Sequence, residues 1–444
     1  MKFSLFKKYT AQNLKHQIIE ICGIKLKFKN TKLDKNLLKN NEIIEKELAK
    51  KAKTDKINVT FMVHMASMFP AKPFAKFLLN QEKYNVKILI TPEYRFGKEN
   101  AKKYIEECAQ LYKKEFGEEN IIIAPLEEQD DNIDLKSFTD ILFPAVPYDV
   151  SHSKYNLGRI VNLGILPALV NYAFYRAKYE RYALISKTYY ATFWKIFTET
   201  KYNHQEYIDY SLVKDKNCAL VGYCKMDDYI NYENKYKQDK KTIMIAPHHS
   251  IDGGYNKALS LSNFAKYSEL FLSLPDKYPD INFIFRPHPA LFYCLVDVGH
   301  WTQEKVDKYI KDMKSKANVI YDDNGDYFKS FAKSDGIIQD CGSYLVEYFY
   351  TEKPQCYLLK QEKDIDDKFV ELGKKCLENC YIAYNEQAII DYIENVIIKD
   401  KDPKKEARID FARNVVKMNY PNVSQKMYEH FEEIFSRSVE WKEL

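Results

Sequence analysis

Short apolar runs alternate with amphipathic stretches along most of this chain. The runs at 57–64, 86–91, 121–125 and 140–144 have the length of buried strands, and the stretch 98–115 carries an apolar stripe at helical spacing. Regular alternation of strands and helices predicts a parallel, doubly wound α/β sheet. We expect further strands at 182–186 and 219–223, and helices at 73–82 and 188–200.

The same pattern starts again at residue 242. Strands are predicted at 242–247, 281–285, 319–321, 337–338 and 355–359. Helices are predicted at 259–275, 304–315, 327–333 and 386–396, and a long C-terminal helix at 403–437 is expected to break near Pro421. The predicted domains are a basic N-terminal segment at 1–55, α/β domains at 56–230 and 231–400, and C-terminal helices at 401–444 that pack back.

Composition narrows the cellular setting. Of the 444 residues, 45% are hydrophobic, yet the sequence has no apolar run of the roughly 18 residues that cross a bilayer. The chain does not open with the pattern of an export signal, and its nine cysteines include no C-x-x-C pair. We therefore expect a cytoplasmic protein without a disulfide framework or a zinc site.

Charge is unevenly distributed along the chain. The net charge is only +5, too small by itself to indicate a nucleic-acid partner. Residues 1–53 hold 14 lysines against five acidic residues, so the remainder is net negative. This basic segment, interspersed with apolar residues, is predicted either to rest peripherally on an anionic membrane surface at the inner face, or to form a solvated helix or linker.

The stretch 334–354 carries the most specific pattern. Its sequence is S-D-G-I-I-Q-D-C-G-S-Y-L-V-E-Y-F-Y-T-E-K-P, which reads as a strand end, a small polar turn and a helix that stops at Lys353-Pro354. A helix N-terminus after such a turn favours an anion. Ser343 can donate to a phosphate oxygen, and Glu347, one helical turn further on, can accept from a ribose diol.

The spacing S-D-x(4)-D-x-x-S-x-x-x-E-Y-x(4)-K-P resembles the donor-binding signature of the CDP-glycerol glycerophosphotransferases of teichoic-acid and capsule synthesis. Asp340, Ser343, Glu347 and the lysine-proline pair match, whereas Cys341 and Gly342 stand where the family has tyrosine and serine. The resemblance implies a GT-B-like arrangement, with two Rossmann-like domains facing across a cleft and a C-terminal crossing helix. It also implies transfer of glycerol phosphate or a similar polyol phosphate from a CDP-activated donor to a glycan or lipid-linked acceptor.

Three predicted strand-end loops of the second domain bring together residues suited to a pyrophosphate. In a parallel sheet these loops lie at one edge, where ligands bind. They contribute His248, His249 and Ser250; Arg286 and His288; and Asp340, Gly342, Ser343 and Glu347. We predict that Arg286 clamps phosphate oxygens and that His248 and His288 stabilise charge on the leaving group. A loop histidine with a purely structural role is the competing interpretation for each.

The acceptor hydroxyl needs a base, which the family takes from a histidine loop of the first domain that is absent here. His152, with Asp149 beside it, and His64 are the candidates by position. No D-x-D motif stands at a strand end, so the sequence requires neither a metal nor another cofactor. Two other functions remain open: an inverting GT-B glycosyltransferase that uses a nucleotide sugar, and a non-catalytic nucleotide- or glycan-binding protein.

Overall fold

The computed structural model describes residues 6–10, 16–21, 24–29, 35–233, 235–236, 239–254 and 259–437. The chain forms two compact units. Unit 1 takes the chain up to Ala173, Tyr182–Asp227 and the part from Asn422 on. Unit 2 takes Phe174–Arg181 and Asp228–Pro421. The sequence placed the boundary between the two α/β domains after residue 230.

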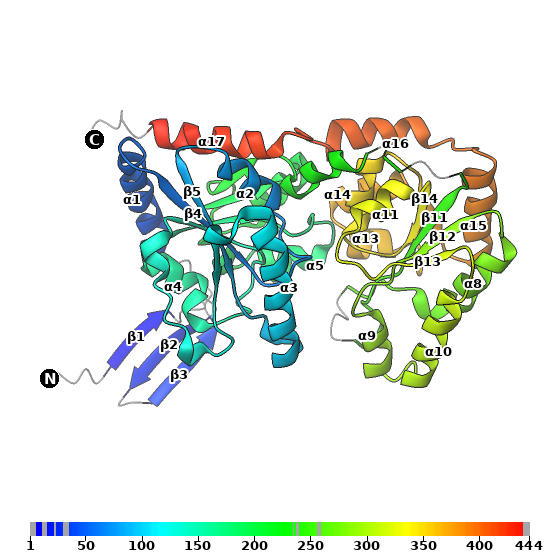
Figure 1. Cartoon of the computed structure of the whole chain (residues 1–444), viewed down its shortest axis with the longest axis horizontal. Helices are drawn as coiled ribbons and strands as arrows, with labels where there is room; N and C mark the ends of the chain where they lie inside the picture. Colours follow the sequence, from blue (N-terminus) through cyan, green and yellow to red (C-terminus); the bar gives the residue numbers. More distant parts are fainter. Residues whose placement is uncertain are drawn as a thin grey trace. The chain divides into compact units, whose positions relative to one another are not determined.

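Unit 1 is built on a parallel sheet to which the described residues contribute seven strands, in the order β10-β9-β8-β7-β4-β5-β6. Figure 1 labels β4 and β5 of this sheet. The strands are β4 Ile57–Val63, β5 Tyr84–Ile90, β6 Ile121–Ile123, β7 Ile141–Pro144, β8 Leu166–Val170, β9 Lys195–Thr198 and β10 Cys218–Leu220. All neighbouring strands pair in parallel, as the alternation of apolar runs predicted.

The helices of unit 1 cover both faces of its sheet. Among the described residues they are α1 Lys35–Lys51, α2 Lys72–Leu79, α3 Lys98–Phe116, α4 Leu157–Asn162, α6 Thr188–Ala191, α7 Lys201–Tyr210 and α17 Val423–Arg437. Along β4, Val59 and Phe61 belong to one apolar cluster and Met62 to another, because successive side chains of a strand point to opposite faces.

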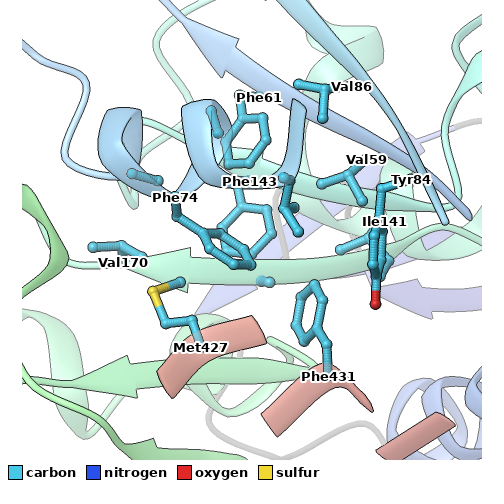
Figure 2. Packing of buried hydrophobic residues seen from close by; sticks show 14 of the residues in the cluster. Val59, Phe61, Phe74, Tyr84, Val86, Ile141, Phe143, Val170, Met427 and Phe431 are labelled. Carbon is cyan, nitrogen blue, oxygen red and sulfur yellow. The ribbon is translucent and has the colours of Figure 1, made fainter. Parts of the chain in front are cut away.

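The larger cluster joins the sheet to the last helix of the chain. Phe431 of α17 is fully buried, and its ring centroid lies 5.5 Å from that of Phe74 and 5.7 Å from that of Trp194. Figure 2 shows Phe431 and Met427 of α17 beside Phe74, Phe143 and the strand residues. Residues from the two ends of unit 1 therefore complete one core.

The region 166–200 was predicted wrongly. The run at 182–186 is a π-helical turn, Arg181–Ile185, and the expected helix at 188–200 holds α6 followed by β9. Strand β8 was not predicted. Short apolar runs do not distinguish a strand from a buried helical turn, and in Lys195–Thr198 β-branched and aromatic residues suit a pleated strand.

Unit 2 has a second parallel sheet, which in the part of the chain described here has six strands in the order β13-β12-β11-β14-β15-β16. The strands are β11 Thr242–Ala246, β12 Asn282–Phe285, β13 Val319–Tyr321, β14 Gly336–Gln339, β15 Gln355–Leu358 and β16 Tyr381–Ala383. Every strand except β16 was predicted. Both units are thus parallel α/β sheets, as expected for two Rossmann-like domains.

Unit 2 surrounds this sheet with helices, most of them short. They are α5 Lys178–Glu180, α8 Phe264–Lys277, α9 Leu291–Asp297, α10 Gln303–Lys314, α11 Phe328–Lys333, α12 Tyr344–Glu347, α13 Asp364–Lys368, α14 Glu371–Glu378, α15 Glu386–Asp391 and α16 Lys405–Phe411. The predicted C-terminal helix is interrupted, since α16 belongs to unit 2 and α17 to unit 1, with Pro421 between them.

The basic N-terminal segment contains regular structure. Strands β1 Phe6–Thr10, β2 His16–Ile21 and β3 Ile24–Lys29 pair antiparallel, and α1 follows. Ile44 and Leu48 of α1 lie in the core of unit 1. No helix in the described residues is both long and apolar enough to span a bilayer.

Candidate functional site

The carboxyl ends of β11, β12 and β14 form the centre of the candidate site in unit 2. Strand β11 pairs with β12 on one side and with β14 on the other. Because β11 comes first in sequence and later strands lie on both sides of it, the connections leave in opposite directions between β11 and β14. Ligands of open α/β sheets bind at such a switch point. His248 and Asp340 follow the two strands there.

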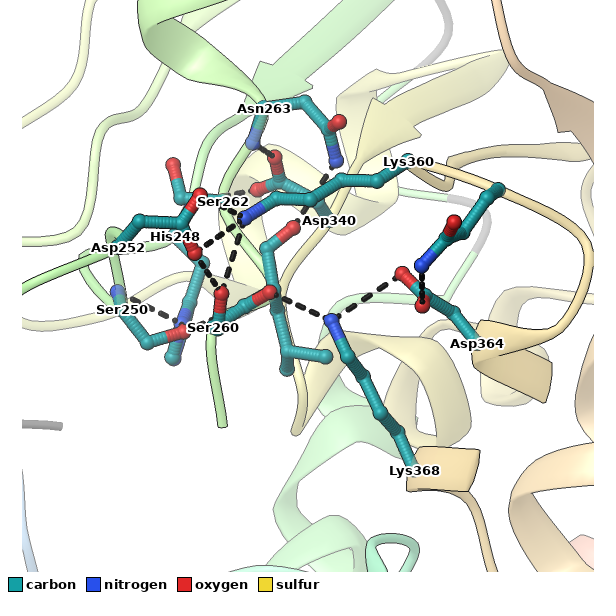
Figure 3. A network of polar contacts seen from close by, with 12 residues as sticks. His248, Ser250, Asp252, Ser260, Ser262, Asn263, Asp340, Lys360, Asp364 and Lys368 are labelled. Carbon is teal, nitrogen blue, oxygen red and sulfur yellow. Dashed lines mark hydrogen bonds and ion pairs between the residues drawn. The ribbon is translucent and has the colours of Figure 1, made fainter. Parts of the chain in front are cut away.

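Asp340 fastens the loop that carries His248. Its carboxylate is fully buried and accepts the backbone N–H of His248, with an Oδ1–N distance of 2.7 Å, and the backbone N–H of Asn263 (Figure 3). Burial raises the pKa of Asp340 to about 7, against the opposing effect of the two N–H donors. The sequence predicted that Asp340 binds the donor. In the structure its carboxylate holds the loop that carries His248 in place.

The same loop is held from the β15 side. The Lys360 amine lies 2.8 Å from both carboxylate oxygens of Asp252 and 2.9 Å from the Ser260 hydroxyl. Lys368 of α13 donates to the carbonyl oxygen of Ser260 at 2.9 Å. Figure 3 shows these contacts around the described parts of the loop. The loop that bears the histidines is therefore tied to two neighbouring elements.

Three imidazole rings meet at this edge. The ring centroids of His248 and His249 are 4.2 Å apart, those of His249 and His288 4.0 Å, and those of His248 and His288 5.4 Å. His248 and His249 are buried. Burial, followed by the charge of Arg176, lowers the pKa of His249 to about 4, and burial followed by His249 and Arg286 lowers that of His288 to about 3. Burial also holds the pKa of His248 well below its ordinary value, so all three rings are neutral near pH 7.

Backbone contacts fix where the protons of two rings lie. Nδ1 of His248 accepts the N–H of Ser250 at 3.2 Å, and Nδ1 of His288 accepts the N–H of Ala290 at 3.1 Å. A neutral imidazole with an accepting Nδ1 carries its proton on Nε2. Ser250 is buried, and its hydroxyl lies 2.8 Å from the same Nδ1 of His248. Ser250 therefore orients the His248 ring.

The three rings have ligand nitrogens within 4.8 Å of one another, a spacing that can hold a metal ion. A histidine that binds a metal almost always donates its other ring N–H to an acceptor. In His248 and His288 that other nitrogen already accepts a backbone N–H, so Nε2 offers a proton and not a lone pair. This donor pattern suits an anion better than a cation.

Arg286 ties three strand ends together. Its Nη1 lies 2.6 Å from Asp322, its Nε donates to the Tyr344 hydroxyl at 3.1 Å, and its Nη2 donates to the carbonyl of Asn324 at 2.6 Å. The Arg286 side chain is about one-tenth exposed. The sequence predicted that Arg286 clamps phosphate oxygens. Such a clamp would use the guanidinium N–H donors that remain after these three hydrogen bonds.

The helix that follows the turn after β14 is shorter than the sequence predicted. The helix that begins after Ser343 is a single α-turn, α12, continued by a 3-10 turn at Tyr348–Thr351, so its dipole is small. Ser343 does not cap it and lies 3.6 Å from Cys341, Oγ to Sγ. Glu347 is fully buried and accepts the Tyr327 hydroxyl at 2.5 Å. The Lys353 amine donates to the carbonyls that end α11.

Arg176 belongs to this site and was not predicted. Its segment joins unit 2 through a bridge between Ala177 and Phe369, and its carbonyl accepts the N–H of Val370 at 3.0 Å. The guanidinium lies against Gly342, in the turn after β14. An isolated arginine in an aromatic-rich stretch more than 160 positions before Gly342 carries no motif that identifies this placement.

His64 occupies the corresponding position in unit 1. It follows β4, the first strand of that sheet, whose neighbours are β5 and β7. Its Nδ1 lies 2.7 Å from the Thr91 hydroxyl, and within the described residues its buried Nε2 has no hydrogen-bond partner. Burial lowers the pKa of His64 to about 4. His64 therefore has a ring nitrogen available for a ligand.

Both ring nitrogens of His152 have hydrogen-bond partners, whereas only one ring nitrogen of His64 has one within the described residues. His152 is buried, and its Nδ1 and Nε2 lie 2.7 Å from Asp131 and from the Tyr94 hydroxyl, respectively. The carboxylate that orients it is that of Asp131, not that of Asp149 as the sequence suggested. The Tyr94 hydroxyl also donates to the carbonyl of Leu126, so the partners of both ring nitrogens of His152 belong to unit 1 itself. These contacts give His152 a clear structural role.

Comparison with known proteins identifies the fold. No family model matches the sequence, and no curated protein matches it. A UDP-GlcNAc 2-epimerase from Neisseria meningitidis bound to UDP-GlcNAc is 15% identical, with a TM-score of 0.55 over 85% of this chain and 100% of its own. The S. aureus MnaA–UDP structure is 14% identical, with a TM-score of 0.53 over 86% and 97%. The wall teichoic acid polymerase TagF is 13% identical, with a TM-score of 0.54 over 92% and 100%. The chain thus has the two-sheet α/β fold of GT-B-type enzymes.

Proposed function

We propose that this protein is a transferase that uses a nucleotide-activated donor, with the donor diphosphate bound at the carboxyl edge of the unit 2 sheet. The observation that carries the proposal is the group of His248, His249 and His288. His248 and His288 are neutral rings whose Nε2 atoms carry protons and can donate to phosphate oxygens, and the guanidinium groups of Arg176 and Arg286 lie close enough to lower the pKa of rings in this group. Buried N–H donors stabilise the negative charge that develops on a leaving phosphate.

The favoured reaction is transfer of a polyol phosphate, such as glycerol phosphate, from a CDP-activated donor to a glycan or lipid-linked acceptor of a cell-surface polymer. The match of Asp340, Ser343, Glu347 and Lys353 to the glycerophosphotransferase signature supports it. A similar fold in TagF, in a structure soaked with CDPG, is consistent with it. No metal or other cofactor is required by the proposed chemistry.

In this reaction the acceptor hydroxyl attacks the β-phosphorus. The new bond joins acceptor oxygen to phosphorus, and the bond from that phosphorus to the oxygen of CMP breaks. The acceptor proton passes to a base, for which we favour His64. When Nδ1 of His64 donates to Thr91, Nε2 presents a lone pair. The imidazole N–H groups of unit 2 stabilise the departing CMP.

A nucleotide-sugar glycosyltransferase is the second candidate. Cys341 and Gly342 depart from the glycerophosphotransferase signature in the turn that meets the donor. Structures of similar fold include one bound to UDP-GlcNAc and one with UDP. In this case the acceptor attacks the anomeric carbon with inversion, and a nucleoside diphosphate leaves with both bonding electrons.

Donor screening separates the two candidates. The full-length protein is incubated with CDP-glycerol, CDP-ribitol and a panel of UDP-, GDP- and TDP-sugars, each with membrane extract as acceptor source, and nucleotide release is followed. CMP release from a CDP-polyol supports the first candidate, whereas release only from a nucleotide sugar supports the second. Failure to bind or turn over any of these donors would refute a transferase.

Variants connect the activity to the site. His288→Asn is expected to lower kcat at least 10-fold, because it removes one donor to the leaving phosphate. His300→Asn changes an exposed histidine of the same unit and serves as the matched control. Equal activity in the two variants would remove the histidine group from the mechanism.

We also propose that the first 34 residues, with eight lysines and two acidic residues, bring the enzyme to an anionic membrane surface that carries a lipid-linked acceptor. Flotation with vesicles of 30% phosphatidylserine is expected to capture the full chain and not a variant lacking residues 2–34. Equal capture of both would refute this membrane role.

A further inference from the structure

Tyr344 follows the turn after β14 at a position that the glycerophosphotransferase signature leaves open, between Ser343 and Glu347. It is the first residue of α12 and is half-buried. Its ring centroid lies 5.0 Å from that of Tyr327 and 5.0 Å from that of Phe331. These two rings hold the Tyr344 ring, and with it the position of the hydroxyl.

The hydroxyl of Tyr344 accepts a hydrogen bond but donates none to the residues that the structure describes. The Nε–H of Arg286 donates to the hydroxyl oxygen at 3.1 Å. Burial raises the pKa of Tyr344 above its usual range, so the hydroxyl keeps its own proton near neutral pH. Because Arg286 approaches one side of the oxygen, the proton lies on another side. Tyr344 therefore presents an O–H donor next to the guanidinium.

Arg286 holds this oxygen from a fixed frame. Its other two nitrogens donate to Asp322 and to the Asn324 carbonyl, each at 2.6 Å. Asp322 in turn accepts the backbone N–H and the side-chain amide of Asn324, at 3.2 and 3.0 Å, and the hydroxyl of Ser330. The Asp322 carboxylate also balances the charge of Arg286. The Tyr344 hydroxyl thus adds a donor of set position without adding charge.

This donor lies at the edge that carries the imidazole rings. His288 follows Arg286 by two residues, and its backbone N–H donates at 3.0 Å to the carbonyl of Pro247, the residue before His248. Strands β12 and β14, which lead to Arg286 and to Tyr344, flank β11 on its two sides. The hydroxyl, the guanidinium and the Nε2 protons of the rings are therefore carried by three adjacent strand ends. N–H and O–H donors gathered in this way suit the oxygens of a phosphate.

We infer that Tyr344 is a further residue of the donor site, whose hydroxyl donates a hydrogen bond to a phosphate oxygen of the nucleotide-activated donor while Arg286 holds its oxygen in place. This inference rests on the proposed function, because it assigns a group to the same site. The turn has Cys341 and Gly342 where the signature has two residues with hydroxyl groups, and Tyr344 supplies a hydroxyl from a different position. Since the contact is to phosphate, CDP-linked and UDP-linked donors should use it alike.

Binding of phosphate-bearing probes tests this assignment. The dissociation constants of inorganic pyrophosphate, CDP and UDP are measured by calorimetry for the full-length wild type and for Tyr344→Phe. Loss of the hydroxyl is expected to weaken binding of all three probes by about 10-fold, as for a hydrogen bond to a charged group. Phenylalanine keeps the ring contacts, and thermal unfolding checks that the variant is folded. Tyr293→Phe, which removes an exposed hydroxyl of α9 in the same unit, is the matched control.

A double-mutant cycle separates direct donation from support of Arg286. Arg286→Lys keeps a positive charge but has no Nε–H to donate to Tyr344. If the hydroxyl contacts the phosphate itself, Tyr344→Phe will weaken pyrophosphate binding by at least about 3-fold in this background too. If Tyr344 acts only by orienting Arg286, the second change will cause no further loss. Where Arg286→Lys no longer binds pyrophosphate, Asp322→Asn replaces it in the cycle, because it loosens Arg286 without removing it.

The outcomes distinguish this inference from the proposed function. A wild type that binds none of the three probes would refute the donor site itself. A wild type that binds them, with unchanged dissociation constants in a folded Tyr344→Phe variant, would overturn only the role of Tyr344. Equal losses in Tyr344→Phe and Tyr293→Phe would do the same, as would the absence of a further loss in the cycle. A loss confined to CDP and UDP, with pyrophosphate unaffected, would overturn the contact to phosphate.

Discussion

The buried carboxyl group of Asp340 makes a sharp prediction about pH. Burial raises its pKa from 3.8 to about 7. A group with a higher pKa in the folded than in the unfolded protein contributes stability that is complete below pH 3.8 and is lost as the pH rises through about 7. Between pH 5 and pH 8 the unfolded chain is already ionised there, so wild-type stability falls by about 3 kcal/mol through this group.

Asp340→Asn removes this titration. The carboxamide oxygen accepts only one of the two backbone N–H groups, from His248 and Asn263, and leaving the other unpaired costs about 1–3 kcal/mol at every pH. The difference in opening free energy, wild type minus variant, should therefore shrink by about 3 kcal/mol between pH 5 and pH 8. Because both proteins share every other titrating group, the difference isolates Asp340.

Native-state hydrogen exchange measures this difference locally. Peptides covering 242–254 and 259–270 report the two amides, and their rates are corrected for the intrinsic pH dependence of exchange. Asp335→Asn is the matched control. Asp335 accepts the backbone N–H of Thr242 at 2.7 Å at the other end of β14, and a carboxamide oxygen can keep that bond, so this variant shows what the change from carboxylate to carboxamide costs without a lost acceptor. A difference between wild type and Asp340→Asn that stays within about 1 kcal/mol from pH 5 to pH 8 would refute the reasoning.

The remaining predictions concern unit 1. Burial lowers the pKa of His64 from 6.5 to about 4, so the free energy of unfolding of the wild type should fall as the pH falls below 6.5. In urea unfolding, His64→Gln should lose about 2 kcal/mol less of this free energy than the wild type between pH 7.5 and pH 5. His300→Gln is the control, and equal losses in His64→Gln and the wild type would contradict the prediction. Asp227 accepts the N–H groups of Val423 and Ser424 at the start of α17. Asp227→Ala should therefore lower the free energy of unfolding by about 1–2 kcal/mol and lower Tm, and Ser424→Ala, which removes only a hydroxyl, should lower it less. The reverse order would disprove the role of Asp227 as the cap of α17. Phe431→Ala should cost about 3–5 kcal/mol by emptying the centre of the core, measured by denaturant unfolding, whereas Phe431→Leu should lose less; a cost below 1 kcal/mol for alanine would contradict this packing.

The arrangement of the sheets could be predicted because buried parallel strands are continuous apolar runs. Strands such as β4 and β11 have this form and are bounded by polar or turn residues. Strand β8 was not predicted, because its apolar run, Leu166–Val170, contains a proline and an alanine and lies near equally apolar helical turns. Only its neighbours in the sheet decide its conformation.

The histidines of the site were also predictable, since the carboxyl ends of neighbouring parallel strands meet at one edge. The proton positions on His248 and His288 were not, because they depend on backbone N–H groups two residues further along the chain. Arg176 was not predictable either. It reaches the site through backbone pairing with Phe369 and Val370, which no local sequence pattern records.

The position of α17 has a consequence for how the protein is made. Unit 1 needs Phe431 in its core, yet the ribosome synthesises all of Asp228–Pro421 before that residue emerges. Until then Phe74 and Phe143 lack their last cover, so a nascent first half is a natural client for a chaperone. An expression fragment that stops at Asp227 should be insoluble, and a soluble version would need residues 422–437 attached through a flexible linker.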